Sequence, residues 1–74
     1  MKVIDGRAMF PPEPFERTLE ALAELAPGEA LKLIVNCQPR PLYRVLEQNG
    51  YAWTEQMFPD GRCEIVIREK SPRS

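Results

Sequence analysis

Prolines and glycines divide this chain into short segments, and their spacing limits the fold more than any other feature of the sequence. Because proline cannot continue a helix or a central strand, and glycine favours turns, each segment between them holds at most one helix or strand. The interruptions are Pro12 and Pro14, Pro27 and Gly28, Pro39 and Pro41, Gly50, and Gly61. A chain of 74 residues is also close to the lower limit for a single core. We therefore predict one domain over residues 1–70 and a disordered tail over residues 71–74.

Two segments are predicted to be helices, and each begins at a pair of prolines. The first turn of a helix tolerates proline because its amide hydrogens have no helical partner to lose. The first helix begins at Pro12 and Pro14, and the second runs from Pro39 or Pro41 to Asn49. The apolar stripes that cover a flat surface are Phe15, Leu19, Leu22 and Leu25 in the first helix and Leu42, Val45 and Leu46 in the second.

Four segments are predicted to be strands, and the last two form a hairpin around Pro59-Asp60-Gly61. They cover residues 2–5, 30–36, 51–58 and 62–69. The element order βαβαββ predicts a two-layer α/β sandwich, in which two helices lie on one face of a four-stranded mixed sheet. Right-handed crossovers make the first three strands point the same way. Their carboxyl ends, where ligands bind in open α/β sheets, then bring together residues 9–12, residues 36–40 and the hairpin turn.

The composition excludes several classes of function. Ten basic and eleven acidic residues give a net charge of −1, which argues against nucleic-acid binding. The chain has no histidine and only two cysteines, so it has no histidine base and no self-contained structural zinc site. No segment is long and apolar enough to cross a membrane. We expect a cytoplasmic protein with reduced thiols, no metal and no cofactor.

Three motifs resemble the TusA/SirA-like small sulfur-carrier superfamily, and the resemblance covers nearly the whole chain. They are Asp5-Gly6-Arg7, Pro12-Glu13-Pro14 and Leu25-Ala26-Pro27-Gly28-Glu29. In the sulfur carriers the first loop reads D-x-R-G-x-x-C-P-x-P, and its cysteine accepts and passes on a persulfide. The matching residue here is Pro11, which has no thiolate, and Ala8 replaces a glycine.

The second loop, NCQPRPLY, resembles a branch of the superfamily that lacks the carrier cysteine and whose activity is not assigned. That branch usually reads D-H-D-P-R-P-L, so Asn36, Cys37 and Gln38 all depart from it. The resemblance implies the fold of a carrier without its usual reaction.

Two pairs of charged residues are candidates for an anion or partner site. Asp5 and Arg7 either form such a site or tie down their own loop by hydrogen bonds. Arg40 and Arg44 lie one turn apart at the start of the second helix, where an anion would be stabilised. Their alternative interpretation is two solvated side chains that balance nearby acids.

Cys37 precedes the same helix and lies near Arg40, an environment that favours a thiolate. Alternatively it is a small buried residue that ends a strand. The sheet order of the superfamily implies that Cys63 lies near Cys37, so a reversible disulfide or a sulfur relay is a further hypothesis. Tyr51 and Trp53 on an edge strand, together with Ile34 and Val66 on the uncovered sheet face, either form a protein-docking surface or complete the core.

The function we expect is a non-enzymatic binding or regulatory module at the carboxyl edge of the sheet. Its partner is a protein or a small anionic ligand. The residues expected to take part are Asp5, Arg7, Pro11, Pro12, Cys37, Pro39 and Arg40. The alternatives are a sulfur-transfer or thiol-redox protein that uses Cys37, or one domain of a larger assembly.

Overall fold

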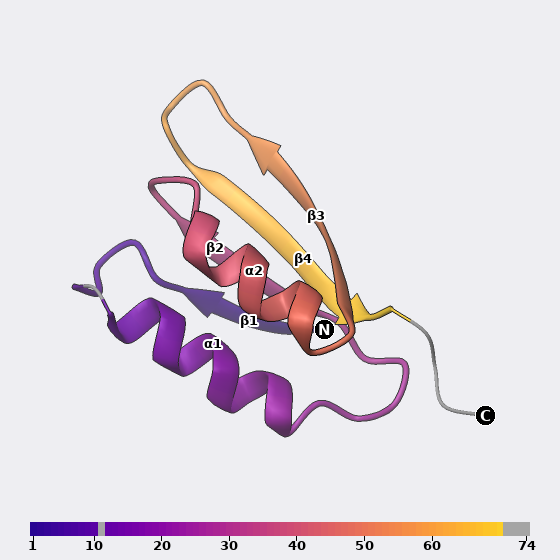
Figure 1. Cartoon of the computed structure of the whole chain (residues 1–74). Coiled ribbons are helices and arrows are strands. Elements are labelled where there is room, and N and C mark those ends of the chain that lie inside the picture. Colours follow the sequence, from indigo (N-terminus) through magenta and orange to yellow (C-terminus); the bar gives the residue numbers. More distant parts are fainter. Residues whose placement is uncertain (11, 71–74) are drawn as a thin grey trace.

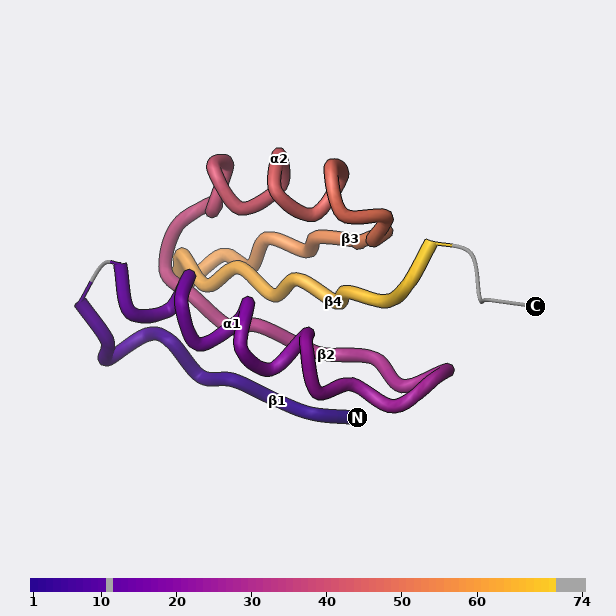
Figure 2. The backbone as a smooth tube through the Cα atoms, turned by 60° about the horizontal axis from the view of Figure 1, so that its bottom comes forward, coloured from indigo at the N-terminus to yellow at the C-terminus, as the bar shows by residue number. Residues whose placement is uncertain are grey.

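The computed structural model describes residues 1–10 and 12–70, and it has the predicted architecture. The elements are β1 (Lys2–Asp5), α1 (Glu13–Ala23), β2 (Leu31–Val35), α2 (Arg40–Gln48), β3 (Tyr51–Met57) and β4 (Cys63–Glu69). Both helices lie on the same face of the sheet, with α1 over β1 and β2 and α2 toward β3 (Figures 1 and 2). The predicted α/β sandwich is thereby confirmed. Pro11 and the predicted tail lie outside the described residues.

The strand order in the sheet is β1-β2-β4-β3. β1 pairs with β2 in parallel, whereas β4 runs antiparallel to both of its neighbours, β2 and β3. β1, β2 and β3 therefore point in the same direction, as the crossover argument predicts. Their carboxyl ends meet at one edge of the sheet, which also carries the loops that lead into α1 and α2 (Figure 1).

The two helices begin in the same way. Pro12 and Pro39 occupy the N-cap positions, and Pro14 and Pro41 follow two residues later, inside the first turn. Neither helix has a side-chain hydrogen bond at its N-cap. The first helix ends at Ala23, two residues before the predicted stripe ends, because the chain already turns toward Pro27 and Gly28.

The core lies between the helices and the sheet. Burial alternates along β2 and along residues 63–67 of β4, so every second side chain there points toward the helices and is buried. The buried apolar residues are Leu22, Leu31, Leu33, Val35, Leu42, Leu46, Cys63, Ile65 and Ile67. Thr18 is also buried, and its hydroxyl donates a hydrogen bond of 2.7 Å to the carbonyl of Pro14.

Tyr51 and Trp53 belong to this core and not to the uncovered face of the sheet. Trp53 lies opposite Ile67 in the β3–β4 register, so both side chains point toward the helices. The Trp53 ring stacks on Tyr43 of α2, with 5.1 Å between the ring centroids. The structure therefore supports the interpretation that Tyr51 and Trp53 complete the core.

The open face of the sheet carries mixed side chains. Ile34 and Val66 point to this side, as expected, and both are half-buried. Between them Lys32 and Glu64 form an ion pair of 3.3 Å. This face is therefore not continuously apolar. In the described part of the chain, no helix is long and apolar enough to cross a membrane.

Gly6 explains the motif that follows β1. Its amide donates a hydrogen bond of 2.7 Å to the carbonyl of Ile34, which continues the pairing of β1 with β2. A Cβ at this position would lie 3.1 Å from the Cβ of Pro14 and 3.2 Å from a methyl group of Val35. Glycine thus allows the loop after β1 to pass close to the first turn of α1.

Candidate functional site

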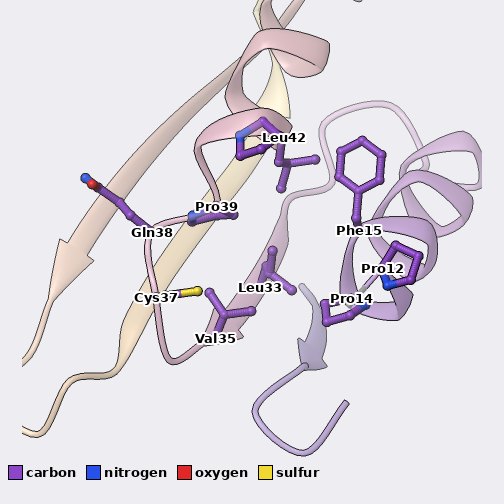
Figure 3. A pocket seen from close by; sticks show the side chains of 10 residues that line it. Pro12, Pro14, Phe15, Leu33, Val35, Cys37, Gln38, Pro39 and Leu42 are labelled. Carbon is purple, nitrogen blue, oxygen red and sulfur yellow. The ribbon is translucent and has the colours of Figure 1, made fainter. Parts of the chain in front are cut away.

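An apolar cavity of about 390 Å³ opens between the first turns of α1 and α2, above the carboxyl end of β2 (Figure 3). α1 and the residue before it supply one wall, the loop before α2 and its first turn supply the other, and β2 forms the floor. The lining residues are Pro12, Pro14, Phe15, Leu33, Val35, Cys37, Gln38, Pro39, Pro41 and Leu42.

The paired prolines account for the character of this cavity. Each helix begins with a Pro-x-Pro sequence, and all four of these prolines contribute to the lining. A proline has no amide hydrogen, so these positions offer carbon surface where another helix start would offer hydrogen-bond donors. The cavity therefore favours an apolar group over a free anion.

The structure brings several of the predicted site residues together. Pro12, Cys37 and Pro39 line the cavity. Arg40 does not line it but borders a second depression of about 360 Å³, which Arg40 forms with Pro41 and Arg44. Pro41 belongs to both depressions, so the predicted arginine pair adjoins the apolar cavity.

Asp5 and Arg7 do not line the cavity, and they bind each other. The Arg7 side chain donates hydrogen bonds of 2.9 and 2.7 Å to the two carboxylate oxygens of Asp5, and its backbone amide donates a third of 3.1 Å. The side-chain bonds from Arg7 hold the pKa of Asp5 at about 2, below its ordinary value of 3.8. This geometry agrees with the loop-tying interpretation of the pair.

Cys37 is exposed, and its sulfur points into the cavity (Figure 3). The interpretation of Cys37 as a buried residue that ends a strand is therefore wrong, because β2 ends two residues earlier, at Val35. Cys63 is buried and lies opposite Val35 in the β2–β4 register. Both cysteines are free thiols, and burial raises the pKa of Cys63.

A polar network that the sequence did not reveal connects the loop before α2 to β3. The Gln38 side chain turns away from the cavity (Figure 3). Its amide nitrogen lies 2.9 Å from each carboxylate oxygen of Glu55. The Tyr43 hydroxyl donates a further hydrogen bond to Glu55, at 2.5 Å. Arg40 in turn donates to the side-chain oxygen of Gln38, at 3.3 Å.

The pKa values of two members of the network, Glu55 and Tyr43, differ from their ordinary values. The bonds from Tyr43 and then Gln38 lower the pKa of Glu55, because they stabilise its carboxylate. Burial, followed by the bond to Glu55, raises the pKa of Tyr43. The network therefore keeps Glu55 ionised and fixes the loop between β2 and α2 at one wall of the cavity.

One signal in the sequence points to Glu55. It shares a strand face with Trp53, two residues away, where a core-facing strand would normally continue with an apolar residue. Gln38 and Tyr43 carry no comparable signal, because their partner lies on a strand far away in the sequence. Among residues 1–10 and 12–70, no three cysteine, aspartate or glutamate side chains come together as they would to hold a metal ion.

Comparisons with known proteins agree with this fold. A SirA-like protein from Desulfitobacterium hafniense, known from a crystal structure, superimposes with a TM-score of 0.81 and 28% sequence identity. The match covers 90% of this chain and 95% of that one. The chain is thus a SirA/TusA-like small domain.

The chain also matches the sequence model of a protein family. Residues 3–69 match the family described as uncharacterized conserved protein (DUF2249), and the chain belongs to that family. A search of curated proteins gives no match.

Proposed function

We propose that this SirA-like domain is a non-enzymatic binding module, and that its binding site is the apolar cavity between the first turns of α1 and α2. The cavity itself is the observation on which the proposal depends. Its volume of about 390 Å³ is within the range of small-molecule sites. It also lies at the carboxyl edge of the parallel strands, where open α/β sheets bind their ligands.

Two further features support a binding role without chemistry. Pro11 occupies the position at which the sulfur carriers have their reactive cysteine, so the first loop has no nucleophile there. Cys37 offers one thiol to the cavity, the amide of Gln38 turns away toward Glu55, and the other lining side chains are carbon. Such a surface holds an apolar group and has no acid–base pair with which to transform it.

An uncharged apolar probe tests the site directly. Titration of 4-phenyl-1-butanol into ¹⁵N-labelled protein is expected to shift the amide signals of Phe15, Val35 and Leu42 in a saturable way. The variant Cys37→Phe, which fills the cavity from an exposed position, is expected to lose this response. Cys37→Ser is the matched control and is expected to keep it. Shifts confined to the open face of the sheet, or no saturable shifts, would contradict the proposal.

The second candidate function is sulfur transfer or thiol redox chemistry at Cys37. The observation in its favour is that this thiol is exposed at the edge of the sheet that also carries the first loop. In this hypothesis a desulfurase persulfide transfers its outer sulfur to the Cys37 thiolate, and the desulfurase thiolate is released. The carrier function would then have moved from the first loop to the second.

Intact mass distinguishes the two candidates. The reduced protein is incubated with a cysteine desulfurase and cysteine, and Cys37→Ser serves as the control. A non-enzymatic module gains no mass. The addition of one sulfur atom to the wild type alone would establish the carrier function instead.

A further inference from the structure

Two depressions of different character share one residue at the start of α2. The apolar cavity lies on one side of Pro41, and the depression formed by Arg40, Pro41 and Arg44 adjoins it. Arg40 and Arg44 are both exposed. In the described part of the chain neither forms an ion pair, although Arg40 donates a hydrogen bond to Gln38 and its charge contributes to the lowered pKa of Glu55.

The charge of Arg40 is unusual for its position. It is the first residue of α2, where the helix dipole favours acidic side chains, and the first turn of α2 contains no acidic residue. The corresponding residue of α1 is Glu13, which follows the usual preference. When a residue at a concave surface goes against the preference of its helix position, the reason is often that the residue binds a ligand.

From this arrangement we infer the class of ligand, an inference that rests on the proposed binding function. We propose that the cavity holds the apolar body of a small molecule with a single carboxylate, and that Arg40 and Arg44 bind this carboxylate beside Pro41. Planar guanidinium groups match the geometry of a carboxylate, with two parallel hydrogen bonds. The apolar walls explain why a free inorganic anion would gain little from the site.

The shape of the site also sets the arrangement of the ligand. The carboxylate must lie outside the cavity, because the lining itself offers no cationic side chain. The apolar body must therefore lie at one end of the molecule and the acid at the other, with Pro41 between them. An aryl or alkyl carboxylate with a short linker has this form.

The test compares two probes that differ only in charge. Isothermal titration calorimetry measures the binding of 4-phenylbutyrate and of its neutral analogue 4-phenylbutanamide to the wild-type protein and to a double variant, Arg40→Gln with Arg44→Gln. Arg68→Gln is the matched control, because Arg68 is exposed and lies on the other face of the sheet. Arg44→Gln alone is included as a milder variant, in case the double variant does not fold.

We expect the carboxylate to bind about fivefold more tightly than the amide, which is the advantage of an exposed ion pair. The double variant should lose this preference, and Arg68→Gln should keep it. Equal affinities of the two probes for the wild type, with both in the cavity, would overturn the ligand class and leave the proposed binding function intact. Binding of neither probe would contradict both.

Discussion

The two strand–loop–helix units of this domain share a proline pattern and differ in charge. In the first unit, Pro12-Glu13-Pro14 begins α1, and in the second, Pro39-Arg40-Pro41 begins α2. The charged groups of the first unit pair within it, because Glu13 forms an ion pair of 3.4 Å with Arg17 and Asp5 binds Arg7.

The second unit is less self-contained. Arg40 has the unfavourable sign for the start of a helix, and the exposed thiol of Cys37 lies in the loop before it. Gln38 of that loop bonds to Glu55 on another strand. The difference indicates that the first unit mainly stabilises the fold, whereas the second presents the groups available for binding.

The largest expected effect is a loss of stability when a fully buried leucine of α2 is shortened, compared with a half-buried leucine of α1. Leu46 of α2 is 0% exposed, whereas Leu19 of α1 is half-buried. Leu46→Ala should lower the free energy of unfolding by about 2–5 kcal/mol, because it removes buried methyl groups and leaves a cavity. Leu19→Ala should cost clearly less in urea denaturation. Equal losses would mean that Leu19 contributes as much to the core as Leu46 does.

A smaller effect is expected at the contact between the two units. Gly6→Ala places a methyl group 3.1 Å from Pro14 and 3.2 Å from Val35, so these neighbours must move by a few tenths of an ångström. We expect a loss of about 1–3 kcal/mol in the free energy of unfolding, as for other overpacked sites. Amide shifts near Pro14 and Val35 should accompany it. Unchanged stability would show that the loop after β1 relaxes freely.

α1 begins with an acidic residue and α2 with a basic one. Removing the charge of each residue should therefore change the stability of the fold in opposite directions. Glu13→Gln should lower stability by about 0.3–1 kcal/mol, because it removes an acidic group from the start of α1. Arg40→Gln should leave stability unchanged or raise it slightly. Thermal unfolding at low salt measures both variants, and a loss of the same size in each would remove the basis of the comparison.

The smallest effect concerns the Asp5–Arg7 pair. The folded-state pKa of Asp5 is about 2, below the ordinary value of 3.8, so the pair stabilises the fold above pH 4 and loses this effect as the pH falls toward 2. Carboxyl ¹³C NMR should give a midpoint near 2 for the wild type. Arg7→Gln should return it toward the ordinary value, whereas an unchanged midpoint would exclude Arg7 as the cause.

The sequence predicts the element order and the core faces of β2 and β4, because each strand has an apolar residue at every second position, although Ile34 and Val66 are apolar on the other face as well. It does not predict the buried face of β3, since Ala52 and Trp53 place apolar side chains on both faces of that strand. The cavity could not be predicted either. Its walls include Phe15 and Leu42, whose separation depends on how the two helices pack.

Some residues of the site could be predicted from the sequence, and others could not. Cys37 and Pro39 could be located from the loop that follows a predicted strand. The polar network could not, because Gln38 and Tyr43 bond to Glu55 on β3, a strand whose buried face the sequence does not predict. Local patterns therefore predict the elements, and the contacts between distant elements define the site.

The most direct test of the binding site is a crystal structure under xenon pressure, because xenon occupies apolar cavities. We predict xenon density between Phe15, Val35 and Leu42, within the cavity at the start of the two helices. The absence of xenon from this cavity, with xenon bound elsewhere in the same crystal, would contradict the account.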